Sequence, residues 1–274
     1  MRLRHLAPAY LIGAFCLAAT PALAADPVPL AAHRALYKLN MDSSHGGDVT
    51  AASGTMAYEI TDVCDGWATR QRLAMTLTNR DGQDIESVSD YATWESKDGL
   101  SMRFRMRQTT DTAVTDQVEG TAKLDSPGGP GSISYTVPDE KTLPIPAGTA
   151  FPMVHTATII AAAEAGKRFI ALPIFDGTGD KGVQDSSVAI ANWNPPAAAA
   201  YPALAELPSG RVRVAFFDRM HSAASGKDKV AGSPDYEVGM KYWANGVADD
   251  LQMDFSDFVM RGKLSEFTLV EPHC

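Results

Sequence analysis

Residues 101–107 read Ser101-Met102-Arg103-Phe104-Arg105-Met106-Arg107, so three large apolar side chains alternate with three arginines. Successive side chains of a β-strand point to opposite faces, and this period of two predicts a strand with one buried face and one basic face. The same pattern occurs at 67–77 (WATRQRLAMTL), where Leu73 and Leu77 fall on one face and Arg70 and Arg72 on the other. The protein therefore contains half-buried strands whose exposed faces carry arginines.

Similar strands are expected on both sides of this stretch, separated by turns rich in Gly, Asn and Asp. Few helical segments alternate with them, which argues against an α/β fold and favours one large, mostly antiparallel sheet that curls on itself. The prolines Pro144 and Pro146 exclude a central strand at 142–149. The other expected strands are 35–41, 56–60, 169–175, 183–190, 211–218, 236–243 and 247–255.

One helix interrupts the strands, at residues 152–166 (PMVHTATIIAAAEAG). Pro152 suits a first helical turn, the alanines favour helix, and Gly166 can end it. The pattern places Val154, Ile159 and the alanines on its buried side. Residues 192–208, rich in proline and alanine, are expected to form an irregular loop.

The first 24 residues have the features of a secretory signal peptide. Arg2 and Arg4 precede a short apolar run, and Ala22-Leu23-Ala24 offers the small-x-small pattern that signal peptidase recognises. The alternative is a membrane anchor, but the apolar run is shorter than the roughly 20 residues that a span needs. We therefore expect a signal peptide at 1–24, a single domain at 25–274, no transmembrane segment after cleavage, and a periplasmic location.

The charge balance excludes one class of partner. The chain has a net charge of −9, and without Arg2 and Arg4 it has 22 basic against 33 acidic residues. Nucleic-acid binding needs a basic face that displaces counterions, so no nucleic-acid partner is expected. Docking on anionic lipid by charge alone is also disfavoured.

Two cysteines, Cys64 and Cys274, follow the expected cleavage site. An even pair in an exported chain usually forms a disulfide, although two free thiols or an intermolecular bridge remain alternatives. A catalytic redox role is not indicated, because the chain has no CxxC pair.

Candidate ligand or partner contacts are sparse. Arg103, Arg105 and Arg107 share one strand face, and with Arg70 and Arg72 they would form a basic stripe if their strands lay close together. Such a stripe suits a phosphate, a cell-wall carboxylate or an acidic partner, and the alternative is an ordinary solvated face. His155, near the start of the helix, and His33 are further candidates, with a buried, hydrogen-bonded histidine as the alternative.

The sequence contains no catalytic signature, so no enzyme is predicted, and no metal site or cofactor is expected. Asp249, Asp250, Asp254 and Asp257 form the one acidic group that could serve as acid and base in a hydrolase. On strands beside a hairpin, these carboxylates are expected to be solvated instead.

A set of stretches along the chain carries a resemblance to a known family, and they occur in the same order: 33–37, 54–59, 64–67, 143–144, 148–152 with His155, 175–177, 236–251, 253–258 and Cys274. Together they resemble the EipB family, periplasmic proteins of alphaproteobacteria once known only as a domain of unknown function. The resemblance implies a β-spiral or broken β-barrel of more than ten antiparallel strands, with the helix packed inside, and a disulfide between Cys64 and Cys274. It also implies a role in cell envelope integrity, linked to a periplasmic tetratricopeptide-repeat protein.

Two functions follow as expectations. The first is a non-catalytic envelope factor that binds a protein partner or an envelope component. The second is a carrier of a lipid or lipoprotein, because a curled sheet can enclose an apolar cavity.

Overall fold

The computed structural model describes residues 28–219, 233–255 and 257–272. The expected signal peptide therefore lies outside the described residues. Strands form one antiparallel sheet of 14 strands in the order β8-β7-β6-β5-β4-β3-β2-β1-β14-β13-β12-β11-β10-β9. The predicted fold class, a broken antiparallel barrel of more than ten strands, is confirmed.

The first eight strands precede the main helix. They are β1 (His33–Ser44), β2 (Val49–Asp62), β3 (Gly66–Asn79), β4 (Asp84–Ser96), β5 (Ser101–Thr110), β6 (Ala113–Leu124), β7 (Gly131–Val137) and β8 (Lys141–Ile145). The remaining elements are α1 (Pro152–Glu164), β9 (Phe169–Ile174), β10 (Gln184–Ile190), α2 (Pro202–Ala205), β11 (Ser209–Asp218), β12 (Tyr236–Trp243), β13 (Ala248–Asp254) and β14 (Phe258–Leu269).

The alternation in β5 is realised as predicted. Met102, Phe104 and Met106 are buried, and the three arginines between them are exposed. Phe104 packs edge-on against Phe175, with ring centroids 5.1 Å apart, in an apolar cluster under β5 to β8. The arginines remain outside because burial of an unpaired guanidinium costs far more than an exposed position.

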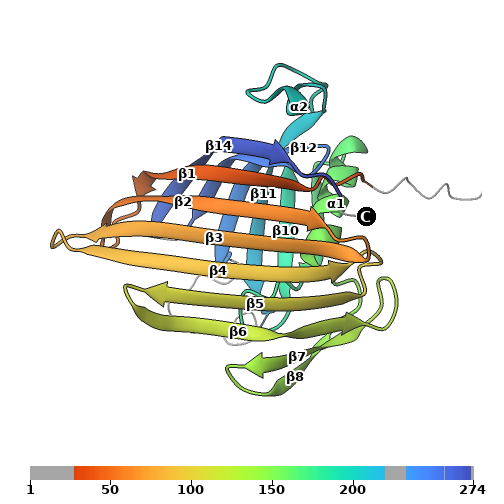
Figure 1. The fold of residues 1–274 in the computed structure, drawn as a ribbon, viewed down its shortest axis with the longest axis horizontal. Coiled ribbons are helices and arrows are strands. Elements are labelled where there is room, and N and C mark those ends of the chain that lie inside the picture. The colour runs from red at the N-terminus through yellow and green to blue at the C-terminus, as the bar shows by residue number, and fades with distance from the viewer. Residues whose placement is uncertain (1–27, 220–232, 256, 273–274) are drawn as a thin grey trace, which may run out of the picture.

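The sheet curls without closing. In Figure 1 the strands β1 to β6 lie in front and β10 to β12 behind, while β8 and β9 form the two ends of the strand order. Pro144 lies in β8, where a missing amide donor is tolerated because the strand is an edge. Near β9, Ala150 forms an isolated parallel bridge with Ile174, which partly covers that edge.

Helix α1 packs inside one end of the sheet, as predicted (Figure 1). Ile159, Ala162 and Ala163 join the core formed by β1, β2 and β10 to β14. Gly166, with φ +72°, ends the helix in a Schellman motif in which the Lys167 amide donates to the Ala162 carbonyl. The prediction for Val154 was wrong: its side chain is exposed, on the side of the helix opposite to the core.

A short helix that the sequence did not predict, α2, lies in the segment expected to be irregular. Its Leu204 is fully buried against Trp243 and Val247, so a local apolar cluster orders part of this alanine-rich segment. Neither α1 nor α2 has the length and apolar character of a membrane span.

Candidate functional site

Two adjoining hollows lie within the curled sheet, with volumes of about 420 Å³ and 270 Å³. They share Tyr58, Gln71, Met153, Thr156 and Tyr242 in their linings. The wall formed by β2 to β4 is mostly polar and uncharged, whereas the facing wall formed by β12 and β13 is mostly apolar. The polar wall includes Tyr58, Thr69, Gln71, Ser89, Tyr91 and Thr93, and the apolar wall includes Val238, Met240, Leu251 and Met253.

The start of α1 is held by a buried carboxyl group. The helix has no side-chain N-cap and no acidic residue in its first turn. Instead, Glu95 at the end of β4 accepts a hydrogen bond from the Met153 amide, 2.9 Å from its Oε2. Its other oxygen, Oε1, is buried without a hydrogen-bond partner among the described residues. Burial raises the pKa of Glu95 to about 8, although the Met153 hydrogen bond opposes this shift.

His155 connects the same helix to the opposite side of the sheet. Its Nε2 lies 2.9 Å from Ser186 Oγ, and the Ser186 hydroxyl donates to the Leu172 carbonyl. The Ser186 proton is thus already used, so His155 Nε2 carries a proton and donates it. Burial lowers the pKa of His155 to about 4, which keeps the ring neutral.

His33, the other candidate histidine, has a separate environment. Its Nδ1 lies 2.8 Å from the Ala31 carbonyl oxygen, and its ring lies between those of Tyr58 and Phe267. Burial lowers its pKa. His33 lines the smaller hollow and His155 the larger one, so the structure places both at the interior space but not in contact with each other.

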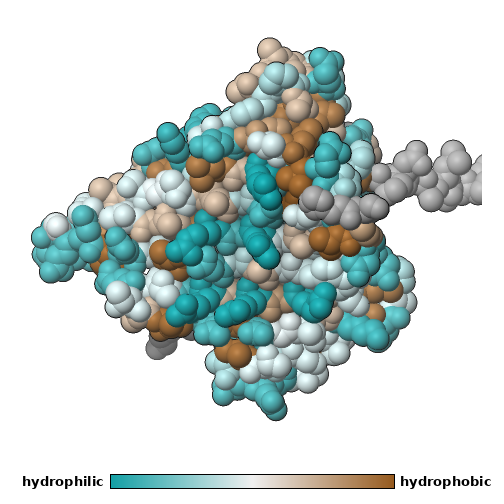
Figure 2. All heavy atoms as spheres, in the orientation of Figure 1, coloured by the Kyte–Doolittle hydropathy of each residue, from teal (hydrophilic) through white to brown (hydrophobic). Residues whose placement is uncertain are grey.

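A third hollow, of about 690 Å³, lies on the outer face of β14 and β1 to β5, and we call it the arginine groove. Figure 2 views this face and shows hydrophilic residues gathered over its centre. The groove is hollow because Ala57 and Ala92 occupy its middle while long charged side chains surround them. The polar side chains that line it outside are Arg34, Glu59, Arg70, Arg72, Asp90, Arg105, Arg107, Glu266 and Thr268.

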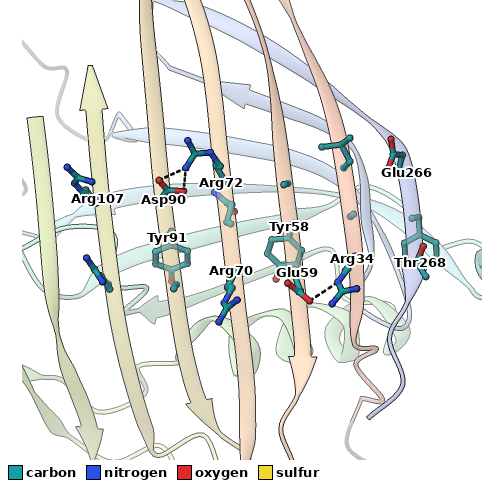
Figure 3. Close-up of a pocket in the computed structure, with 17 residues that line it drawn as sticks. Arg34, Tyr58, Glu59, Arg70, Arg72, Asp90, Tyr91, Arg107, Glu266 and Thr268 are labelled. Atoms are coloured by element: carbon teal, nitrogen blue, oxygen red, sulfur yellow. Dashed lines mark hydrogen bonds and ion pairs between the residues drawn. The ribbon is translucent and has the colours of Figure 1, made fainter. Parts of the chain in front are cut away.

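Three of the five groove arginines have carboxylate partners. Arg34 pairs with Glu59 at 2.7 Å, and Arg72 with Asp90 at 2.6 Å, as the dashed lines in Figure 3 show. Arg105 lies 3.9 Å from a carboxylate oxygen of Glu119, beyond hydrogen-bond distance. Arg70 and Arg107 have no ion pair or hydrogen bond among the described residues, and Figure 3 shows both without a dashed line.

The basic stripe inferred from the sequence is thus only partly the groove. Arg105 and Arg107 line it together with Arg70 and Arg72, across the intervening strand β4. Arg103 does not line it, because its guanidinium lies over the Trp94 ring, 4.4 Å from the ring centroid.

The remaining candidates have other surroundings. Cys64 lies in the turn between β2 and β3 with φ +72°, while Cys274 lies outside the described residues, so the disulfide stays a prediction. Asp249 accepts hydrogen bonds from the amides of Asp250 and Leu264. Asp250 forms ion pairs with Arg211 and Lys263, so both aspartates already have partners within the fold.

Sequence reasoning missed Glu95 and the polar interior wall. The signal was present in β4, where Ser89, Tyr91, Thr93 and Glu95 alternate with outward residues, but both faces of this strand carry polar side chains. In the described part of the chain, no His, Cys, Asp and Glu side chains cluster in a way that could hold a metal ion.

The open antiparallel sheet, the enclosed helix and the hollows on both faces of the sheet define a β-barrel-like protein. The model of the family described as EipB-like matches residues 24–271, and the chain belongs to that family.

Two relatives from Brucella abortus support this assignment. The chain is 31% identical over 258 residues to the cell envelope integrity protein EipB of strain 2308, covering 91% of this chain and 88% of that protein. It is also similar to the crystal structure of a β-barrel-like protein of a domain of unknown function. That comparison gives a TM-score of 0.78 and 28% identity, and covers 89% of this chain and all of the other.

Proposed function

We propose that this protein maintains the integrity of the bacterial cell envelope from the periplasm, without catalysis, by binding a partner protein or another envelope component. The name of its Brucella relative supports the envelope role. The arginine groove is the observation that carries the binding role: it is a preformed hollow on an acidic protein, and two of its arginines have no ion-pair partner among the described residues. A periplasmic tetratricopeptide-repeat protein is one candidate partner.

A gene deletion tests this function. Cells that lack the protein are expected to lose tolerance to detergent, and the wild-type gene should restore it. A gene carrying Arg70→Glu together with Arg105→Glu should not restore it, because reversed charges repel an acidic partner. Immunoblotting should show equal periplasmic amounts of both proteins. Normal detergent tolerance in the deletion strain would contradict the proposed function.

A second candidate, a carrier of a lipid or an acylated protein, is favoured by the hollows inside the sheet. An apolar wall faces a polar, uncharged one, and this combination suits a neutral amphiphile better than a charged ligand. The carrier function would then use the interior and leave the arginine groove to other contacts.

Native mass spectrometry of gently purified protein tests the carrier function. A bound lipid mass is expected for wild type and should be absent from Val238→Trp, whose larger side chain fills the smaller hollow. Val114→Trp, at an exposed position of β6, is the matched control and should retain the ligand. A wild-type spectrum that shows only the mass of the protein, without a bound lipid, would contradict the carrier function.

A further inference from the structure

The register of three outer strands creates two equivalent positions in the arginine groove. Asp90 of β4 lies directly between Arg72 of β3 and Arg107 of β5. Two residues further along β4, on the same outward face, Ala92 lies between Arg70 and Arg105. Each position therefore has an arginine on either side, but only the first has a carboxylate in the middle.

The Asp90 position shows that one arginine of such a pair binds a carboxylate. Both carboxylate oxygens of Asp90 accept hydrogen bonds from Arg72 Nη1, at 2.7 Å and 2.6 Å. Hydrogen bonds between charged groups are among the strongest in proteins, and guanidinium groups suit carboxylates by shape. The protein thus places its own anion at one of the two positions.

The Ala92 position has no anion between its two arginines, while Glu59 pairs in register with Arg70, and Glu119 with Arg105, on the sides away from Ala92. Neighbouring strands are about 4.8 Å apart, so the Cα atoms of Arg70 and Arg105 lie roughly 10 Å apart across Ala92. Two arginine side chains can converge on an anion within that span. The methyl group of Ala92 leaves the space between them open, and both Ala92 and its arginines line the groove.

We infer that a carboxylate of a partner protein binds over Ala92, between Arg70 and Arg105, in the way that Asp90 lies beside Arg72. This inference rests on the proposed function and specifies the chemistry of its partner. The partner contributes an extended segment with one acidic side chain, and neighbouring apolar residues of that segment lie over Ala57 and Leu36.

The surroundings of the position favour a protein segment over an anionic membrane. Glu59, Asp90 and Glu266 are also in the groove, and they would repel a dense array of phosphates. The net charge of −9 opposes approach to an anionic lipid surface as well. A single carboxylate on an otherwise uncharged segment meets less of this repulsion than an array of phosphates does, because Arg70 and Arg105 lie between it and the nearest carboxylates, Glu59 and Glu119. Arginine is also enriched among the residues that dominate protein interfaces.

Binding of a peptide library tests this inference directly. The probe is a set of random octapeptides with one fixed glutamate, compared with the same set carrying glutamine. The wild-type protein is expected to retain the glutamate set about tenfold better at low salt, because a charge-assisted hydrogen bond is lost with glutamine. Ala92→Asp supplies the anion from the protein itself and should abolish the preference, and Arg70→Ala should reduce it.

Arg103→Ala is the matched control, since it removes an exposed arginine from β5 outside the groove and should keep the preference. Circular dichroism and thermal melting establish that each variant is folded. A preference that persists in Ala92→Asp would overturn the inference, as would equal retention of both peptide sets. Binding of phosphatidylglycerol vesicles through Arg70, without any glutamate preference, would overturn it in favour of a membrane.

The cellular readout separates this inference from the proposed function. If deletion lowers detergent tolerance and the Ala92→Asp gene restores it fully, the result supports the envelope role and contradicts binding of a carboxylate over Ala92. If deletion has no effect on detergent tolerance, the envelope role is contradicted, while the peptide experiment still decides whether the Ala92 position binds a carboxylate.

Discussion

Glu95→Gln is expected to abolish the loss of stability that ionisation of Glu95 causes between pH 5 and pH 9. Burial disfavours the charged form of Glu95 and raises its pKa from the ordinary value of 4.5 to about 8 in the folded protein. Between these values the folded state binds more protons than the unfolded state, so stability falls as pH rises. Each pH unit in that window costs about 1.4 kcal/mol, and three units cost about 4 kcal/mol.

The glutamine variant isolates charge from hydrogen bonding. Its side-chain oxygen can still accept the Met153 amide hydrogen bond that holds the start of α1. We therefore expect wild type and variant to have similar stability at pH 5, and the variant to be the more stable at pH 9, in urea denaturation. Glu86→Gln, on the outward face of the same strand, should follow the wild-type profile. Parallel profiles for wild type and Glu95→Gln would contradict the buried ionisation.

His155 is expected to make the folded protein less stable at acid pH. Burial lowers its pKa from the ordinary value of 6.5 to about 4 in the folded protein, so its contribution to stability is present above pH 6.5 and is lost as pH falls through 4. Glu95 and His155 thus act in opposite directions, so their contributions cancel between about pH 4.5 and pH 6.5 and stability should fall above that range as Glu95 ionises. His155 belongs to α1 and Glu95 accepts a hydrogen bond from its Met153 amide, so both titrating groups lie at the start of this helix.

Cys64→Ser is expected to lower the melting temperature of the oxidised protein substantially. A disulfide between Cys64 and Cys274 closes a loop of about 210 residues, and the chain-entropy model assigns such a loop about 5 kcal/mol. The register supports the proposed pairing, because Leu269 pairs with His33, which in turn pairs with Ile60. The last strand therefore ends two strands away from the end of β2, just before the turn that holds Cys64.

Reductant provides the control for this prediction. A reducing agent should lower the melting temperature of wild type towards that of Cys64→Ser and leave the variant unchanged. Equal melting temperatures of oxidised wild type and variant would show that no stabilising bridge forms. A dimer band of wild type on a non-reducing gel would instead indicate an intermolecular pair through Cys274.

Local patterns in the sequence predict most elements of the sheet. The alternation in 102–107 and 67–77 fixes which side chains are outside, because a period of two leaves each residue only one face. Pro144 and Pro146 correctly exclude a central strand, and β8 lies at an edge. The helix at 152–166 also follows from Pro152, the alanines and Gly166, although its buried side was misjudged at Val154.

The sites depend on strand pairing, which alternation alone does not specify. In β4 both faces are polar, so the sequence could not show that Glu95 points inward to α1 while Asp90 points outward. The positions of Ala92 and Asp90 between arginines follow from a register that joins residues 13 to 22 positions apart. A shift of that register by one residue would reverse which face each side chain occupies.

The sequence by itself thus determined antiparallel strands with basic faces and one helix among them, because these depend on neighbours along the chain; the place of the helix inside the sheet was implied by the resemblance to the EipB family. Only the tertiary structure decided which arginines have partners, which carboxyl group is buried, and where the hollows lie. Those properties arise from the distances between side chains on different strands, and such distances are set when the whole sheet assembles.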